Sequence, residues 1–180
     1  TRVNESAPTE GSADAGFARD MGEHHAQAVD MSFTLLSKSP ASDMETLAYD
    51  IANTQSTQRG MLMGWLQQWE LPQTTSREPM QWMSLLSDSH EHPTDSAGDP
   101  RMPGMATRAQ LDELAAASGV DAERLYLSLM IAHHQAGIEM AQGIVELSSR
   151  PEVRRLAQSM VDGQTSEIAL MESLLDARGG

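Results

Sequence analysis

Apolar residues recur at intervals of three and four along two early stretches of the chain, residues 17–35 and 47–66. Spacing of this kind places apolar side chains on one face of a helix. The residues between the stretches include Pro40, which suits the first turn of a new helix. The pattern therefore predicts two amphipathic helices that are joined by a short turn and form a hairpin.

The same arrangement returns 109 residues later in the chain. With this offset, residues 17–31 align with 126–140 and residues 47–66 align with 156–175. The matched pairs include Met21 with Met130, His24 with His133, His25 with His134, Met31 with Met140, Gln55 with Gln164, and Gln58 with Glu167. Similarity over a whole helical pair indicates a repeated supersecondary unit. Two hairpins bury their apolar stripes most simply against each other, which predicts an all-α four-helix bundle.

We expect a single domain over residues 17–177. It divides into a first repeat (17–70), a long crossover (71–119) and a second repeat (120–177). Within the crossover, Thr107 suits the N-cap of a short helix over residues 108–117. Residues 1–16 are small and polar, and we expect them to form a flexible tether between a processed or lipid-anchored terminus and an exported domain.

Composition narrows the class of ligand. The chain has 12 basic and 26 acidic residues, a net charge of -14, which disfavours nucleic acid and anionic membranes and favours cations. No run of 18 apolar residues is present, so no transmembrane helix is predicted. The chain has no cysteine, which excludes thiolate metal sites and disulfides, but its 13 methionines offer thioether ligands. Any soft metal ligand must therefore be methionine.

Histidine and methionine gather on one face of the first predicted helix. At about 100° per residue, His24, His25 and Met31 all lie within about 80° of Met21 on the apolar stripe. The second repeat gives Met130, His133, His134 and Met140 the same positions, so we expect four imidazoles and four thioethers inside the bundle. A buried imidazole without partners costs about 1–3 kcal/mol. Four of them in register favour a ligand role, although a purely structural role stays open.

The ligand types point to copper. Di-iron bundles carry Glu-x-x-His motifs, whereas the residues three before these histidines are Met21, Gly22, Met130 and Ile131. Thioether suits Cu(I) and imidazole suits Cu(II). Zinc is the weaker alternative, because zinc would bind the histidines alone and give the methionines no role.

The crossover contains further candidates. Met102 and Met105 flank a Pro-Gly turn and could cap a metal site, although a turn packed on the core fits the sequence equally well. The segments 80–83 (Met-Gln-Trp-Met) and 90–92 (His-Glu-His) are weaker signals for metal binding. Three indoles, from Trp65, Trp69 and Trp82, are expected to pack at the ends of the bundle.

These motifs together resemble the domain of unknown function 305 family. The resemblance rests on the tandem Met-x-x-His-His pattern, on the stretch from Gln55 through Met61, Met63, Trp65 and Leu66, and on Met102-Pro103-Gly104-Met105; it covers nearly everything from Phe17 to Leu175. It implies a ferritin-like four-helix bundle, exported or lipid-anchored in bacteria, with periplasmic copper binding and tolerance in some members. The metal ligands it implies here are Met21, His24, His25, Met31, Met102, Met105, Met130, His133, His134 and Met140. Leu174 stands where the first repeat has Trp65, so one metal site of mixed parentage fits as well as two equal sites.

We therefore expect a non-enzymatic protein that sequesters or hands on copper in the periplasm, in the secreted state or at the outer face of the membrane. Three other functions stay open. They are a metal-dependent oxidase, a haem protein with His and Met axial ligands, and a metal-free module whose Met-rich face packs on a partner helix.

Overall fold

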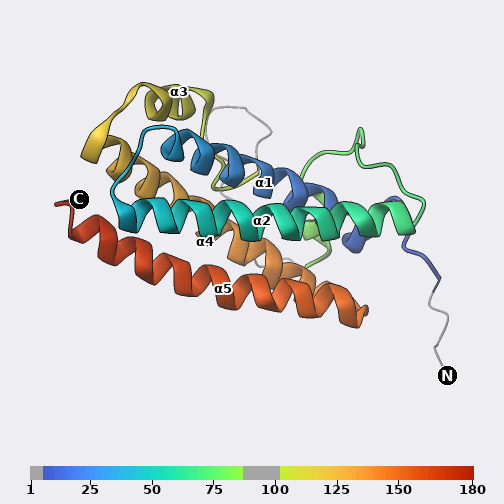
Figure 1. The fold of residues 1–180 in the computed structure, drawn as a ribbon. Helices are drawn as coiled ribbons and strands as arrows, with labels where there is room; N and C mark the ends of the chain where they lie inside the picture. Colours follow the sequence, from blue (N-terminus) through green and yellow to red (C-terminus); the bar gives the residue numbers. More distant parts are fainter. Residues whose placement is uncertain (1–5, 87–101) are drawn as a thin grey trace.

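The computed structural model describes residues 6–86 and 102–180, and all regular secondary structure in these residues is helical. The elements are α1 (Ala13–Leu36), α2 (Ser42–Gln68), the 3-10 helix η1 (Gln81–Leu85), α3 (Arg108–Ala116), α4 (Gly119–Leu147) and α5 (Pro151–Asp176). The four long helices run side by side along the molecule, and the short α3 packs on α1 and α4 (Figure 1). The predicted all-α bundle of two hairpins joined by a long crossover is confirmed.

Each hairpin pairs neighbouring helices, α1 with α2 and α4 with α5, and the hairpins meet through α1 and α4. These two central helices run in opposite directions (Figure 1). The crossover leads from the end of α2 to the opposite end of the bundle, where α4 begins. This arrangement relates equivalent positions of the two hairpins by an approximate twofold axis between α1 and α4.

The first helix begins earlier than the sequence pattern predicts. Ser12 is its N-cap, with the hydroxyl accepting a hydrogen bond from the Ala15 backbone N–H at 3.2 Å, and the Ala15 side chain is buried. The prediction of a flexible tether through residue 16 is therefore wrong for residues 13–16. Before the helix, the Glu10 carboxylate pairs with the Arg19 guanidinium at 2.7 Å, so this end of the predicted tether contacts the bundle.

The short helix of the crossover has the predicted cap. The Thr107 hydroxyl accepts a hydrogen bond from the Gln110 backbone N–H, and the Gln110 side chain accepts one from the Thr107 backbone N–H, which completes a capping box. The helix ends at Ala116, and α4 begins at Gly119 with a φ of 57°. Because a positive φ favours glycine, the residue type at position 119 suits the backbone conformation at the junction of the two helices.

The 3-10 helix η1 was not predicted, and it buries a residue that the helical periodicity of α1 assigns to solvent or to the edge of the bundle. Asp20 is only 9% exposed. Its carboxylate accepts hydrogen bonds from the Met80 backbone N–H and the Trp82 indole N–H, both at 2.8 Å. Burial raises the pKa of Asp20, and the two donors oppose that effect. Asp20 thus attaches the start of the crossover to α1.

The apolar core consists of two clusters at opposite ends of the bundle. Cluster A contains Met21, Leu62, Leu66, Trp82, Met102, Met140, Ile144, Val153, Leu156 and Met160 among its buried members. Cluster B contains Met31, Leu35, Met44, Ile51, Leu114, Tyr126, Leu127, Met130 and Met171. Each cluster takes side chains from all four long helices, so each hairpin contributes to both ends of the core.

Candidate metal centre

Four histidines lie between the two apolar clusters. His24 and His25 come from α1, His133 and His134 come from α4, and all four side chains are 0% exposed. Along α1 they fall between Met21 in cluster A and Met31 in cluster B, and along α4 they fall between Met130 in cluster B and Met140 in cluster A. We call these four residues the histidine layer. The burial predicted from their positions on the apolar stripe is confirmed.

His24 and His133 stack on each other at the centre of the layer. Their ring centroids are 3.6 Å apart and their planes differ by 24°. Both nitrogens of each ring are buried and have no hydrogen-bond partner among the described residues. An unpaired polar atom in the interior costs about 1–3 kcal/mol, so this arrangement is expensive for a site with a purely structural role.

The surroundings keep these imidazoles neutral. Burial lowers the pKa of His24 and of His133 well below 6.5, and the neighbouring imidazoles lower both further. Burial also lowers the pKa of His25 to about 4, although its hydrogen bond with Gln58 opposes the shift. A neutral imidazole has a free lone pair, which is the form that binds a metal ion.

The other two histidines each have one partner on the second helix of their own hairpin. His25 Nε2 lies 2.8 Å from Gln58 Oε1, and His134 Nε2 lies 2.6 Å from Glu167 Oε2. In both rings Nδ1 is buried and has no partner among the described residues. Across the layer, both nitrogens of each stacked ring and Nδ1 of each outer ring therefore have no partner among the described residues, and each neutral ring has one nitrogen lone pair that can bind a metal ion.

Two buried glutamines complete the polar layer. Gln55 and Gln164 occupy equivalent positions on α2 and α5, and the side-chain oxygen and nitrogen of both are buried without partners among the described residues. The Gln164 amide lies close to Gly137 of α4, where a side chain would collide with it. The ligand types in the sequence do not identify Gln55, Gln58, Gln164 or Glu167 as site residues. Polar residues repeated at the same offset within apolar stripes were the available signal.

The candidate methionines fall into two sets. Met21, Met102 and Met140 are buried in cluster A, and Met105 is partly buried against it. Met31 and Met130 are buried in cluster B, on the other side of the histidine layer. The structure thus brings three or four thioethers to one side of the imidazoles and two to the other. The ten candidate ligands do not surround a single point.

The Met-Pro-Gly-Met turn is fixed beside the layer by close contacts on both central helices. Gly104 has a φ of 74°, and a Cβ at this position would lie 2.5 Å from Ala136 Cβ and 2.7 Å from the Ala132 carbonyl oxygen. On the other side, the Gln27 amide accepts a hydrogen bond from the Ala106 backbone N–H and donates one to the Ala106 carbonyl. The turn therefore lies against α1 and α4 at the level of the histidines.

Among residues 6–86 and 102–180, no three histidine, aspartate or glutamate side chains converge as a ready metal site. A metal in the histidine layer would therefore need thioether ligands or rotation of the side chains. The segment 90–92 lies outside the described residues. Met80 and Met83 are partly buried against cluster A, and Met83 Sδ approaches Gly143 of α4, so they contribute to packing there.

The tryptophans pack as predicted. Trp65 and Trp69 stack at 5.9 Å between ring centroids, and the Arg150 guanidinium lies over Trp69 at 5.7 Å. Trp82 packs edge-on against Phe17 at 5.8 Å. All three rings belong to cluster A or pack against it, which places them at one end of the bundle.

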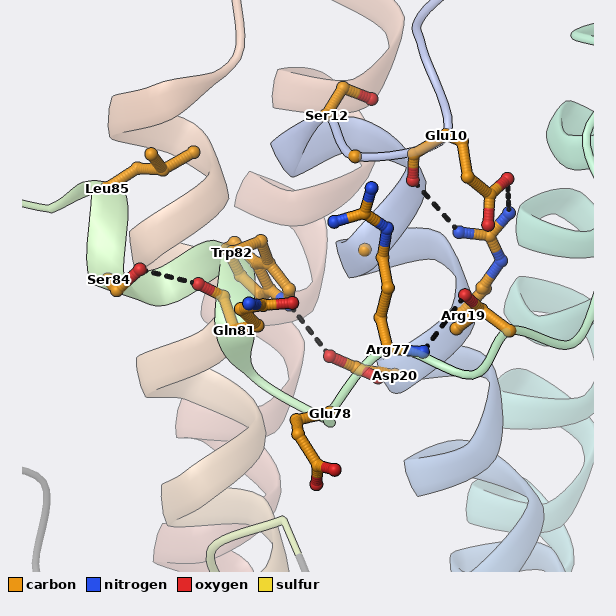
Figure 2. A pocket seen from close by; sticks show the side chains of 13 residues that line it. Glu10, Ser12, Arg19, Asp20, Arg77, Glu78, Gln81, Trp82, Ser84 and Leu85 are labelled. Carbon is orange, nitrogen blue, oxygen red and sulfur yellow. Dashed lines mark hydrogen bonds and ion pairs between the residues drawn. The ribbon is translucent and has the colours of Figure 1, made fainter.

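An open pocket lies near the start of α1, away from the histidine layer. Figure 2 shows Arg19, Asp20, Arg77 and Trp82 around it, and the Asp20 carboxylate accepts a hydrogen bond from the Trp82 indole. No histidine and none of the candidate methionines line this pocket. Its charged groups are of both signs, so it does not single out a ligand of one charge.

These features define an all-α bundle with a buried layer of histidines between methionine-rich clusters. The chain belongs to the domain of unknown function 305 (DUF305) family, whose model matches residues 14–175. This establishes the family that the sequence motifs resemble.

Solved relatives have the same fold. A DUF305 protein from Streptomyces coelicolor is 46% identical to this chain. The two structures match with a TM-score of 0.85 over 96% of this chain and 97% of that one. A DUF305 fragment from Deinococcus radiodurans is 30% identical, with a TM-score of 0.73 over 92% and 96% of the two chains. CopM in its Cu(I)-bound form is 26% identical, with a TM-score of 0.69 over 93% and 98%. CopM has also been solved bound to Cu(II).

A curated relative is known only as a protein without an assigned function. It is protein L153 of Acanthamoeba polyphaga mimivirus, 38% identical over 56 residues, and the match spans 37% of its length and 31% of this chain.

Within the described part of this chain, no helix combines the length and the apolar character needed to cross a bilayer.

Proposed function

We propose that this protein binds copper outside the cytoplasm and sequesters it or passes it on. The observation that carries the proposal is the histidine layer, where four buried imidazoles have ring nitrogens with no hydrogen-bond partner among the described residues, and where burial lowers the pKa of His24, His25 and His133. A metal ion would use those lone pairs and offset the cost of burying them. The flanking thioethers favour copper over metals that prefer oxygen ligands.

The two sides of the layer offer different ligands. On the side of cluster A, Met21 and Met140 lie with Met102, and Met105 packs nearby, so this side supplies more thioethers for Cu(I). On the side of cluster B, Met31 and Met130 are the candidates. His24, His25, His133 and His134 would serve either oxidation state. CopM, which has the same fold, has been solved bound to Cu(I) and to Cu(II), and this supports copper as the metal.

The geometry disfavours two of the alternatives. Haem between the central helices would need to separate His24 from His133, whose rings are in contact at 3.6 Å. Zinc prefers three or four ligands in a tetrahedron, supplied by imidazole, thiolate or carboxylate groups. In the described residues, no three histidine, aspartate or glutamate side chains converge in this way. Copper, which accepts thioethers, fits the donor set better.

The test is a titration of purified protein with Cu(I) and with Cu(II) against competing chelators. We expect tight stoichiometric copper binding that is lost when His24, His25, His133 and His134 are all replaced by Gln. The matched control replaces His90 and His92, the other two histidines of the sequence, by Gln and is expected to preserve binding. Equal loss in the control, or no selectivity for copper over zinc, would contradict the proposal.

A second titration separates the two sides of the layer. Replacing Met21, Met102 and Met140 by Leu is expected to weaken Cu(I) binding by tenfold or more and to leave Cu(II) binding nearly unchanged, because thioether is the softer ligand. The control replaces Met44 and Met171, two buried methionines of cluster B outside the candidate ligand set, by Leu. A comparable loss of Cu(I) affinity in the control would assign the effect to packing.

A further inference from the structure

The two outer histidines occupy equivalent positions but have chemically different partners. His25 on α1 faces Gln58 on α2, and His134 on α4 faces Glu167 on α5. The two pairs are related by the 109-residue offset, and the nitrogen–oxygen distances are alike, at 2.8 Å and 2.6 Å. The geometry is thus repeated, while a neutral amide in one half is replaced by a carboxylate in the other.

We propose that Glu167 is a positioning residue that makes His134 a stronger ligand for Cu(II) than His25, so that the two halves of the histidine layer hold copper unequally. This inference rests on the proposed copper function. It goes further by naming the half that binds more tightly, the ring nitrogen that binds and the residue responsible.

The carboxylate fixes the position of the ring proton on His134. A carboxylate only accepts hydrogen bonds, so the His134 ring donates to it from Nε2, and Nδ1 is the ring nitrogen that faces away from the carboxylate and is available to a metal ion. That Nδ1 is buried and has no partner among the described residues. Gln58 imposes no such choice, because its amide can turn over and present either an oxygen or an NH₂ group to His25. His134 is therefore preorganised for binding through Nδ1, and His25 is not.

The carboxylate also strengthens the ligand electrostatically. A histidine whose second nitrogen donates to a carboxylate is a more basic ligand, and loss of such a partner commonly costs 10–100-fold in metal affinity. Glu167 is 26% exposed and contacts a fully buried ring, so solvent screens this interaction less than a surface ion pair. Its negative charge favours the more highly charged Cu(II) over Cu(I).

The test exchanges the two partners. Three variants are needed: Glu167→Gln, which gives both halves an amide; Gln58→Glu, which gives both a carboxylate; and the double exchange. We expect Glu167→Gln to lower Cu(II) affinity by about tenfold, with Cu(I) affinity changed less than threefold, and to raise the reduction potential of the bound copper. The double exchange is expected to restore Cu(II) affinity to within about threefold of the natural protein, because the carboxylate then supports His25.

Nitrogen-15 NMR of the histidine rings provides a readout that a general loss of stability would not produce. In the metal-free natural protein we expect the His134 proton on Nε2, and on addition of diamagnetic Cu(I) we expect the coordination shift at Nδ1 while Nε2 stays protonated. In the double exchange, His25 should show this pattern. Circular dichroism melting of each variant checks that the fold is kept.

Three results would overturn the inference. They are coordination of His134 through Nε2, Cu(II) affinity unchanged in Glu167→Gln, and a double exchange that is no tighter than Glu167→Gln. Each of these leaves copper binding by the natural protein intact and so contradicts this inference alone. A natural protein that binds no copper would contradict the proposed function as well.

Discussion

His24 of α1 and His133 of α4 stack with ring centroids 3.6 Å apart, and neither ring has a hydrogen-bond partner among the described residues. The contact occurs where the two hairpins meet, at equivalent positions of the two repeats. The centre of the interface between the hairpins is therefore polar, although an apolar pair would fill the same place at lower cost. Under the proposed copper function, stability and ligand binding make opposite demands on these two positions.

Replacement of one stacked histidine by an apolar residue should stabilise the metal-free protein. We expect His133→Leu to raise the free energy of unfolding by about 1 kcal/mol, because it removes two buried nitrogens without partners. The same change should weaken copper binding. Urea unfolding and copper titration of the same sample measure both effects. A destabilised variant would instead show that the imidazole contributes to packing more than its burial costs.

The stability of the metal-free protein should fall as the pH is lowered from 7 to 4. The pKa of His25 is about 4 in the folded chain against an ordinary value of 6.5, so the unfolded chain takes up this proton first and is favoured at acid pH. His25 alone would contribute up to about 3 kcal/mol over this range. Urea unfolding at several pH values measures the slope, and His25→Gln should make it shallower. An unchanged slope in that variant would contradict the burial of His25.

Gly104 and Gly119 provide a matched pair for the Met-Pro-Gly-Met turn. Both have positive φ, 74° and 57°, but a Cβ at Gly104 would collide with α4, whereas one at Gly119 would meet nothing within 4 Å. Gly119→Ala should cost about 1 kcal/mol for its backbone conformation. Gly104→Ala should cost about 1–3 kcal/mol more and displace Met102 and Met105 from the bundle. Thermal unfolding and Cu(I) affinity test this, and equal effects of the two substitutions would place the turn away from α4.

Loss of the Asp20 carboxylate should detach the start of the crossover. Asp20→Ala leaves the Trp82 indole N–H and the Met80 backbone N–H without their acceptor, and we expect a loss of about 2–4 kcal/mol in stability. Asp20→Asn is the control, because one amide oxygen can accept both hydrogen bonds, and its cost should be clearly smaller. Trp82 fluorescence follows the local change, and denaturant unfolding follows the global one. Similar losses of stability in both variants would show that the negative charge of Asp20 matters, and not its ability to accept the two hydrogen bonds.

The sequence was sufficient for the architecture because the long helices carry regular apolar periodicity. It predicted the hairpins, the capped helix after Thr107 and the burial of the four histidines, all of which depend on local patterns that repeat. It also predicted ten metal ligands, and their role stays a prediction. The early start of α1 was missed because Ala13, Asp14 and Gly16 carry little apolar signal.

Tertiary contacts account for what the sequence pattern missed. Asp20 lies away from the centre of the apolar stripe and is buried because η1 covers it, and η1 has no periodicity that would reveal it. The division of the methionines between clusters A and B follows from the antiparallel pairing of α1 with α4, which a pattern within one helix does not contain. In the sequence, Gln58 and Glu167 are only an aligned pair of polar residues. Their contacts with His25 and His134 depend on how each hairpin folds.

The composition of the two clusters has a consequence for any half of this molecule. Cluster A joins the first half of α1 and the second half of α2 to the end of α4 and the start of α5, and cluster B joins the remaining halves. A single hairpin cut from the chain would expose an apolar surface along its whole length and would bury it only against a second hairpin. The present chain is thus the covalent counterpart of a symmetric dimer, with the histidine layer at the position of the dimer axis.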